Sequence, residues 1–417
     1  MAERAGASAA LVAVGAAVAA LSGVAFLAIT ARSLTTEQNT AFLTFWAALF
    51  ALFAVLSGIQ NEVTRAVRAD SMRTGDHDRK TSPLASALIV GAAAALVVLA
   101  LTPLWGVVLV DDTNLIFSVV VMGAAAFLYA GHVAAVGTFA GLGRWRAFAG
   151  LTAGESVVRL ALAVVGAVAG WSVDGFATAA AAGAVTWVAA TLSMPGWRTV
   201  WSLRVAIGRG ALIGRILNAM AASGANALLV TGFPLLMSAT TDPSTYASAA
   251  PVVMAVSMTR APLLIPITAF QSMVIAAFVE HPERARSSLL RLLLLVVAVA
   301  LVGGGLAALV GPWLMALVFG PAYANTPAIL ALLVAAAAFL ALLVLGGAIA
   351  LALDEHAVNT VGWYLAFAVS TAIMLMPLDL ATRTVLALMI GPMVGSAFHF
   401  IFVLRALRRR ESRATAT

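Results

Sequence analysis

The sequence predicts an all-α polytopic membrane protein with about 12 transmembrane helices, arranged as two pseudo-symmetric six-helix lobes. Three observations predict this fold class. The chain is 63% hydrophobic and only 10% charged, whereas a soluble domain is about a quarter charged. Long apolar runs recur from residue 8 to residue 404. A short polar phrase is also written twice, half a chain length apart.

Each apolar run is long enough to cross the hydrocarbon core as a helix, which needs about 20 residues. Barrel strands would instead alternate in hydropathy over about ten residues, and runs such as 292–300 do not alternate. The first run is longer than the apolar core of a signal peptide, which has about 7–15 residues, so we expect a retained span. The predicted spans are 8–30, 40–63, 84–110, 115–140, 147–170, 175–194, 212–237, 247–278, 287–319, 325–352, 357–377 and 383–404.

The distribution of positive charge predicts the orientation of the spans. With a cytoplasmic N-terminus, twenty Arg and Lys residues fall in inner segments, and only Arg32 and Arg383 fall in outer segments. Cytoplasmic loops carry such an excess, so both termini are predicted to be cytoplasmic. The arginine clusters of the inner segments account for the net charge of +7. No extended basic surface remains that would indicate nucleic-acid binding. The sequence contains no Cys, which excludes disulfides, thiolate metal sites and Cys nucleophiles.

The repeated phrase predicts how the two lobes are related. Residues 33–42 read SLTTEQNTAF and residues 238–247 read SATTDPSTYA. They join the first span to the second and the seventh to the eighth, so the repeat is parallel, with a pseudo-two-fold axis along the membrane normal. We expect the shared Thr and acidic side chains to cap helix starts. A second echo, TPLWGVVLV ending at Val110 and GPWLMALVFG ending at Gly320, supports the repeat.

The domain boundaries follow from this repeat. Between the lobes, Trp197, Trp201 and spaced arginines suit a helix that lies at the inner membrane surface; a solvated basic linker is the alternative. The predicted domains are an N-terminal six-helix lobe (1–194), a cytoplasmic interfacial linker (195–214), a C-terminal six-helix lobe (215–404) and a basic cytoplasmic tail (405–417).

Charged residues inside the predicted spans are candidate site residues, because an ionised group at the bilayer centre costs several kcal/mol unless it is paired or hydrated. Glu155 and Arg159 lie four residues apart in the fifth span and therefore share one helix face. Two interpretations are open. The pair is a self-neutralising structural element, or Arg159 faces a cavity and Glu155 tunes its charge.

Arg260 is a different case, because no acidic residue lies within one helical turn of it. It is predicted near the midplane of the eighth span, and Pro262 and Pro266 follow. A proline removes a backbone donor and bends a helix, so the pattern favours an arginine beside a kink in a hydrated cavity. The alternatives are snorkelling to the interface and packing against Glu155 of the other lobe.

Two further groups of residues are candidates for contacts with cargo or ions. Asn61, Glu62 and Arg65 lie at the inner end of the second span, where they would meet a lipid headgroup; a plain positive-inside flank is the alternative. His132 and His399 lie within spans and are candidates for proton coupling; hydrogen-bonded packing residues are the alternative.

The sequence does not predict an enzyme. Asp111 and Asp112 form an adjacent acidic pair at an external mouth, but a membrane glycosyltransferase or metal-dependent phosphatase would show acids or His in sizeable loops. No Walker-type motif is present, so we expect no ATP hydrolysis. We expect no metal and no organic cofactor, and the energy to come from a coupling ion (H⁺ or Na⁺), the membrane potential or the gradient of the substrate.

Three stretches resemble conserved loops of one transporter family. TARSLTTEQNTAF (30–42) resembles the first external loop of polysaccharide flippases, although the usual glycines are absent. LVFGPAYANTPAIL (317–330) resembles the family's loop between spans nine and ten, and GTFAGLGRWRAFA (137–149) its cytoplasmic turn after span four. With the span count, they resemble the multidrug/oligosaccharidyl-lipid/polysaccharide (MOP) exporter superfamily, nearest its Wzx-like polysaccharide flippase branch.

The resemblance implies a MATE-like transporter with alternating access in a bacterial plasma membrane. It implies a cargo of anionic, polyprenyl-pyrophosphate-linked oligosaccharide, flipped from the inner to the outer leaflet for cell-surface polysaccharide biosynthesis. Arg159 and Arg260 would then bind the pyrophosphate through forked hydrogen bonds. The expected partners are the lipid-linked glycan, membrane lipids and a glycan polymerase or glycosyltransferase. The alternatives are a cation-coupled multidrug exporter and a non-transporting scaffold of a glycan-assembly complex.

Overall fold

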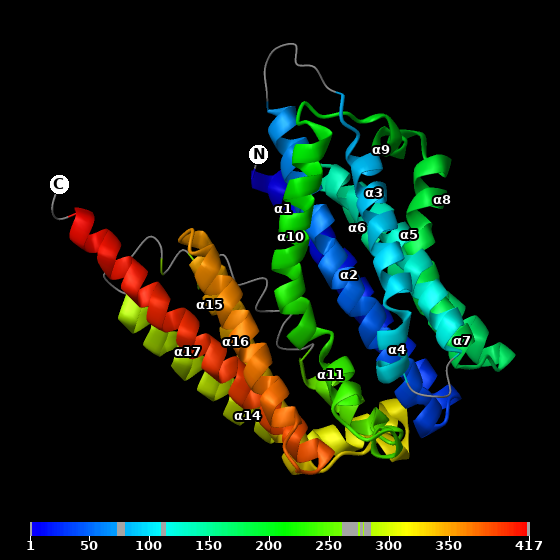
Figure 1. Ribbon diagram of the computed structural model, residues 1–417, viewed down its shortest axis with the longest axis vertical. Helices are drawn as coiled ribbons and strands as arrows, with labels where there is room; N and C mark the ends of the chain where they lie inside the picture. Colours follow the sequence, from blue (N-terminus) through cyan, green and yellow to red (C-terminus); the bar gives the residue numbers. More distant parts are fainter. Residues whose placement is uncertain are drawn as a thin grey trace. The chain divides into compact units, whose positions relative to one another are not determined.

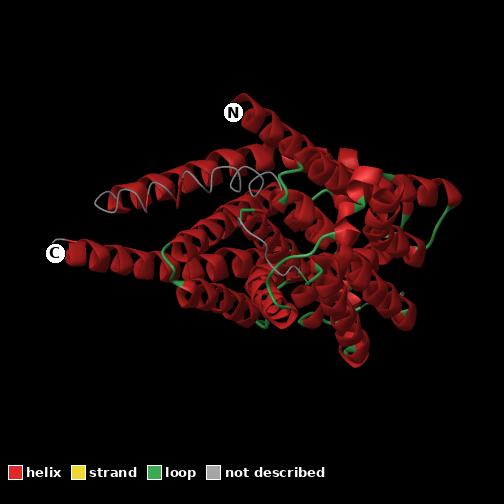
Figure 2. Cartoon of the chain, turned by 90° about the horizontal axis from the view of Figure 1, so that it is seen from above, coloured by secondary structure: helices red, strands yellow, loops and turns green. Residues whose placement is uncertain are grey.

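The structure is a computed structural model that describes residues 2–72, 80–109, 114–260, 274–275, 278 and 285–414. The described elements are helices joined by loops (Figure 2). The chain separates into two compact units, Met1–Ser238 and Ala239–Thr417, and each is described by itself.

Unit 1 is a helical bundle in which α2 packs against α5 and α10, α3 packs against α5, and α1 packs against α6 (Figure 1). In a membrane, small residues let helix backbones approach closely, and packing rather than water drives association. The buried face of α5 is rich in such residues. The helices are α1 (Ala2–Ser33), α2 (Thr36–Ser71), α3 (Pro83–Ala100), α4 (Thr102–Val108), α5 (Leu115–Gly141), α6 (Trp145–Ala169), α7 (Val173–Ala182), η1 (Gly183–Val185), α8 (Thr186–Ser193), η2 (Pro195–Trp197), α9 (Thr199–Ser202), α10 (Arg209–Val230) and α11 (Phe233–Ala239).

Unit 2 is built on α15, which packs against both α14 and α17, while α16 packs mainly against α17. A helix at 250–260 precedes them. The remaining elements are α12 (Pro243–Tyr246), α14 (Ala285–Phe319), η4 (Pro321–Tyr323), α15 (Pro327–Ala352), α16 (His356–Met374) and α17 (Leu380–Ala414).

The predicted spans agree with the helices of the described residues, eleven of which are long and apolar enough to cross a membrane. The eighth predicted span, 247–278, falls largely outside the described residues. Two spans are divided. α3 ends at Ala100 and α4 begins at Thr102, because Pro103 cannot continue the backbone hydrogen bonds of α3. The predicted span 212–237 is divided at Thr231 and Gly232 into α10 and α11.

Both repeated polar segments, 33–42 and 238–247, cap the start of a helix. The capping residues do not stand at equivalent positions of the repeat, because Thr35 corresponds to Thr240 and Asp242 corresponds to Glu37. Thr35 forms a capping box with Gln38 at the start of α2, which satisfies backbone N–H groups that lack a partner in the helix. Asp242 caps α12 by accepting a hydrogen bond from the Ser244 N–H at 3.2 Å. The Ser244 hydroxyl and backbone donors hold the pKa of Asp242 below its usual range.

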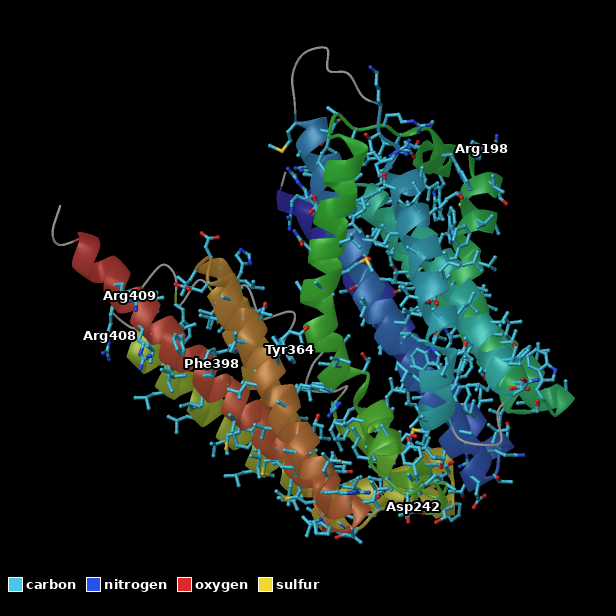
Figure 3. The ribbon with its side chains drawn as sticks, in the orientation of Figure 1. Arg198, Asp242, Tyr364, Phe398, Arg408 and Arg409 are labelled. Carbon is cyan, nitrogen blue, oxygen red and sulfur yellow. The ribbon has the colours of Figure 1, made fainter. Side chains whose placement is uncertain are left out.

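The basic connector, which we define as residues 195–208, is bonded to the helices of unit 1, and its place at the inner membrane surface stays a prediction. Val205 and Thr81 form an isolated antiparallel bridge, and the Ala206 N–H donates to Asp70 at the end of α2 at 3.0 Å. The Trp201 indole donates to Thr191 Oγ1 at 3.0 Å. The exposed side chain of Arg198 marks this end of the unit (Figure 3).

The division into units also differs from the predicted lobes. Helix α10, which we assigned to the C-terminal lobe, clusters with unit 1 because it packs along α2. The chain changes units at Ala239. Ser238 Oγ donates to Val108 O at 2.5 Å within unit 1, whereas Thr240 and Thr241 are bound by Arg383 of unit 2. The six-helix lobe boundaries themselves stay a prediction.

Candidate functional site

The Glu155–Arg159 ion pair is formed on α6, as the spacing of four residues predicts. Both side chains are buried, with 5% and 6% of their surface exposed. The Ser156 hydroxyl donates to the second carboxylate oxygen of Glu155 at 3.1 Å. The pair therefore lies inside unit 1 and its carboxylate is bonded at both oxygens.

Aromatic rings of α2 cover the guanidinium of this pair. The Arg159 Cζ lies 4.7 Å from the ring centroid of Phe50 and 5.7 Å from that of Trp46. A cation over an aromatic face is stabilised by about 2 kcal/mol or more when water is excluded. This contact fixes the orientation of Arg159 and leaves its Nε without a hydrogen-bond partner among the described residues.

Helix α5 supplies the next side chains around the pair. The ring of Tyr129 stacks on Phe53, with centroids 3.8 Å apart, and on His132, with centroids 5.5 Å apart. Helix α5, which carries Tyr129 and the buried His132, packs against α6, which carries Glu155 and Arg159. We call Trp46, Phe50, Tyr129, His132, Glu155 and Arg159 the ion-pair cluster.

The short turn η1 makes room for the carboxylate of the ion-pair cluster. A Cβ at Gly183 would lie 2.7 Å from Glu155 Oε1 and 2.9 Å from Glu155 O, closer than atoms can pack. A glycine at this position is therefore required for Glu155 to sit against η1. This contact cannot be predicted from sequence spacing, because residues 155 and 183 are far apart in the chain.

The sequence pattern also missed the aromatic part of the ion-pair cluster. Trp46, Phe50 and Phe53 lie three and four residues apart and so share a face of α2. Such a stripe is equally typical of ordinary packing, and nothing in its spacing indicates that it faces a charged residue of α6. His132 was predicted as a site candidate, and the structure does bring it to the predicted pair.

Arg260 lies in unit 2, at the end of the described helix 250–260, and is 6% exposed. This residue interacts with other groups of the protein, so it is not isolated. Pro262 and Pro266, on which the predicted kink depends, lie outside the described residues. The structure thus shows that this arginine is buried, and its position near the membrane midplane stays a prediction.

His399 lies in unit 2, at the crossing of α15, α16 and α17. It is fully buried, and its Nε2 lies 3.1 Å from Asn359 O. A Cβ at Gly362 would lie 2.0 Å from this nitrogen. The geometry favours a hydrogen-bonded packing residue, and proton coupling through His399 stays a prediction.

The predicted inner-mouth group is centred on Glu62, which is 1% exposed. Its Oε2 pairs with Arg65 at 3.1 Å, and its Oε1 lies 3.8 Å from Arg215 of α10. Arg65 and Asn61 are exposed. The sequence analysis predicted neither ion pair of Glu62, and Arg215 comes near only because α10 packs on α2; contact of this group with a headgroup stays a prediction.

Arg383 is a further buried arginine that the sequence assigned only to an outer segment. It donates to Thr240 O at 3.1 Å, to Met374 O at 2.9 Å and to Thr241 Oγ1 at 2.7 Å. It therefore holds the second polar phrase against the end of α16. This role is structural, since its hydrogen bonds go to the backbone and hydroxyl groups of unit 2 itself.

Metal binding is not indicated in the described part of the chain, where no group of three or more His, Asp or Glu side chains is placed to hold an ion. The acidic pair Asp111–Asp112 lies outside the described residues.

Comparisons with known proteins show what the chain is similar to. No protein-family model matches it. Two Mycobacterium tuberculosis proteins are similar over nearly the whole chain. Uncharacterized protein Rv1510 is 37% identical over 94% of this chain and 89% of its own length. Uncharacterized protein Rv3630 is 36% identical over 95% of this chain and 92% of its own length.

Solved structures of transporters share the fold. An inward-facing multidrug resistance MATE family transporter of the MOP superfamily matches with a TM-score of 0.71 and 16% identity, covering 94% of this chain and 96% of that chain. A MOP superfamily transporter from Pyrococcus furiosus, described as having a binding pocket of reverse polarity that suggests a different function, matches with a TM-score of 0.66 and 16% identity, covering 95% and 94%. The chain therefore belongs to the family that includes these mycobacterial proteins, and it is a polytopic membrane protein with a MATE-like fold.

Proposed function

We propose that the protein is a transporter of the Wzx-like branch that flips an anionic, polyprenyl-pyrophosphate-linked oligosaccharide from the inner to the outer leaflet of a bacterial plasma membrane. Alternating access of two helical units would move the cargo for cell-surface polysaccharide biosynthesis. The MATE-like fold supports transport, and the bacterial source of the relatives supports the location. The proposal assigns no catalytic step to the chain.

The observation that carries the choice of an anionic cargo is the state of Glu155. A cation-coupled exporter needs carboxylates that are available to bind cations, but Glu155 is already bound by Arg159 and Ser156. Glu62 is likewise paired with arginines. Arg260 adds a buried guanidinium in unit 2. The described charges within the spans therefore favour an anionic group over a cation. The Pyrococcus furiosus protein supports the idea that this fold serves pockets of reversed polarity.

In this proposal, Arg260 supplies the main phosphate contact, because a guanidinium forms forked hydrogen bonds with phosphate oxygens. Arg159 contributes through its Nε–H, which makes no hydrogen bond within the described residues. Asn61 and Arg65, exposed beside Glu62, meet the headgroup as it enters from the inner leaflet. His132, stacked in the ion-pair cluster, is the candidate for H⁺ coupling; a glycan polymerase or glycosyltransferase remains the proposed partner.

The test is lipid-linked glycan flipping by the purified protein in liposomes. Arg260→Gln should lower the initial rate at least about tenfold, because removing one partner of a buried charged hydrogen bond costs about 2–5 kcal/mol. Arg260→Lys should recover only part of the rate, since lysine keeps the charge without the fork. Arg291→Gln, at an exposed position of α14, is the matched control and should flip normally. Unchanged flipping by a well-folded Arg260→Gln protein would show that this arginine does not bind the cargo.

A cation-coupled multidrug exporter is the second candidate, favoured by the likeness to the multidrug resistance MATE transporter. On that reading, Glu155→Gln abolishes drug efflux and Arg260→Gln spares it. A non-transporting scaffold of a glycan-assembly complex would show neither effect. Liposome assays with both cargo classes therefore separate the three functions.

A further inference from the structure

Unit 2 contains an apolar groove that the proposed transport mechanism does not use. It has a volume of about 310 Å³ and is formed where α14 and α17 both pack on α15 but touch each other little. Its lining residues are Leu289, Leu293, Phe339, Leu342, Met393, Ser396, Ala397, Phe400, Ile401 and Leu404. We call it the α14–α17 groove.

The lining of the groove suits a hydrocarbon chain. Its one hydroxyl group, Ser396 Oγ, is already bonded to Pro392 O at 2.6 Å, so the walls present no free hydroxyl donor. The groove is also open along its length, because Leu293, Met393 and Ile401 are 39%, 43% and 50% exposed. A chain from the surrounding lipid can therefore enter from the side without crossing a polar barrier.

The helix spacing of α17 places a positive charge at one end of this groove. The lining residues of α17 recur every three or four positions and end at Leu404. Arg408 continues that helix face four positions beyond Leu404, next to the buried Leu407, and it is exposed. Arg405 is also exposed, with its guanidinium 5.1 Å from the Phe402 ring centroid. Arg408 lies near the end of α17 in Figure 3.

Apolar walls that lead to arginines match the two parts of an anionic lipid. A phosphate group attracts arginine at the membrane surface, and basic pockets between helices on the cytoplasmic side bind anionic headgroups. The inner leaflet, at which the arginine-rich end of α17 is predicted to lie, is where such lipids meet cytoplasmic arginines. The apolar lining alone would accept any hydrocarbon chain. The arginines at its end favour a lipid with a negatively charged headgroup.

We propose that the α14–α17 groove binds one anionic phospholipid, with an acyl chain along the groove and its phosphate on Arg408, beside Arg405. The site is independent of the transported cargo, so it stands or falls separately from the proposed flipping of a lipid-linked glycan. The bound lipid fills the space between α14 and α17 and joins two helices that otherwise touch each other little.

The test uses the full-length protein in detergent, titrated with dioleoyl phosphatidylglycerol or dioleoyl phosphatidylcholine and followed by native mass spectrometry and thermal unfolding. Phosphatidylglycerol should bind more tightly and raise the unfolding temperature more. Arg408→Gln should weaken its binding about fivefold, because one arginine near the membrane surface contributes about that factor. Arg409→Gln is the matched control: it is also exposed but lies about 100° around the helix, and should retain binding within about twofold.

A groove-filling change separates the site from general surface charge. Ala397→Phe should abolish bound phosphatidylglycerol with Arg408 intact; Ile401→Trp, at the open edge, serves if Ala397→Phe does not fold. Equal losses for Arg408→Gln and Arg409→Gln would overturn the proposal in favour of nonspecific attraction. Unchanged binding in a folded groove-filled variant would also overturn it. Displacement of phosphatidylglycerol by equimolar undecaprenyl phosphate would assign the groove to the carrier lipid instead.

Discussion

At the residue scale, the Glu155–Arg159 pair shows how unit 1 keeps two charges in an apolar interior. Each charge alone would be costly to bury. The ion pair and the Ser156 hydroxyl bind both carboxylate oxygens of Glu155, and the Phe50 ring covers the guanidinium of Arg159. The cluster therefore stabilises unit 1 only while both charges are present.

We predict that removing one charge costs more stability than removing both. Arg159→Met leaves a buried carboxylate and Glu155→Gln leaves a buried guanidinium, and each should destabilise the protein by about 3–5 kcal/mol. The double variant should lose less stability than either single variant, because a neutral pair needs no counter-charge. Unfolding of all three variants in the same detergent measures this coupling.

Flipping assays on the same proteins tell whether the pair also acts in transport. A double variant that is stable but inactive supports contact of the ion-pair cluster with cargo. A stable and active double variant would show that the pair is structural only. Strictly additive losses in the unfolding series would contradict the mutual compensation inferred from the structure.

At the element scale, the crossing of α15, α16 and α17 depends on close backbone approach around His399. Gly346, Gly347 and Gly362 all face this ring, and the ring is held by Asn359 O. Because the ring is enclosed on every side, it cannot move aside to admit another carbon atom. The packing of these three helices is therefore sensitive to a single methyl group.

We predict that Gly362→Ala destabilises the protein by about 1–3 kcal/mol, the usual cost of overpacking a well-packed core. Gly154→Ala is the matched control within a helix, because a Cβ there meets nothing within 4 Å. It should be neutral or stabilising, since alanine favours a helix more than glycine does. Thermal unfolding in detergent compares the two. Equal effects at both positions would contradict the close contact, and His399→Ala should rescue Gly362→Ala.

The sequence predicted helices well because an apolar run bounded by polar residues is a local signal. It also predicted the Glu155–Arg159 pair, whose partners lie on one helix. It did not predict the Trp46 and Phe50 contacts or the role of Arg215, because these depend on which helices become neighbours. The break at Pro103 could have been read from the sequence, but the similar Pro312 lies inside the continuous helix α14. A proline therefore breaks or bends a helix according to its tertiary surroundings.

At the scale of the whole molecule, the orientation in the membrane is a prediction from charge alone. The arginine-rich segments are expected on the cytoplasmic side. The absence of native Cys makes single-cysteine labelling direct. Ser202 in the basic connector and Thr245 in the second polar phrase are both exposed, and they are predicted to lie on opposite sides.

We predict that Thr245→Cys reacts with a membrane-impermeant maleimide in intact cells, whereas Ser202→Cys reacts only after permeabilisation. The physical reason is the cost of moving many arginines across the bilayer during insertion. Labelling of the Cys-free parent protein gives the background. The reverse pattern would place both termini outside and would invert the direction of the proposed flipping.

The change of units at Ala239 has a consequence for dividing the protein into two polypeptides. A cut at the start of the basic connector would place bonded residues on different fragments. Trp201 would be separated from Thr191, and Val205 would be separated from Thr81. A cut next to Ala239 would leave each fragment with its own side-chain anchors. Coexpressed halves should therefore reassemble more readily after a cut next to Ala239 than after a cut at the start of the basic connector. Only the cut at the connector separates that segment from the helices of unit 1 to which it is bonded.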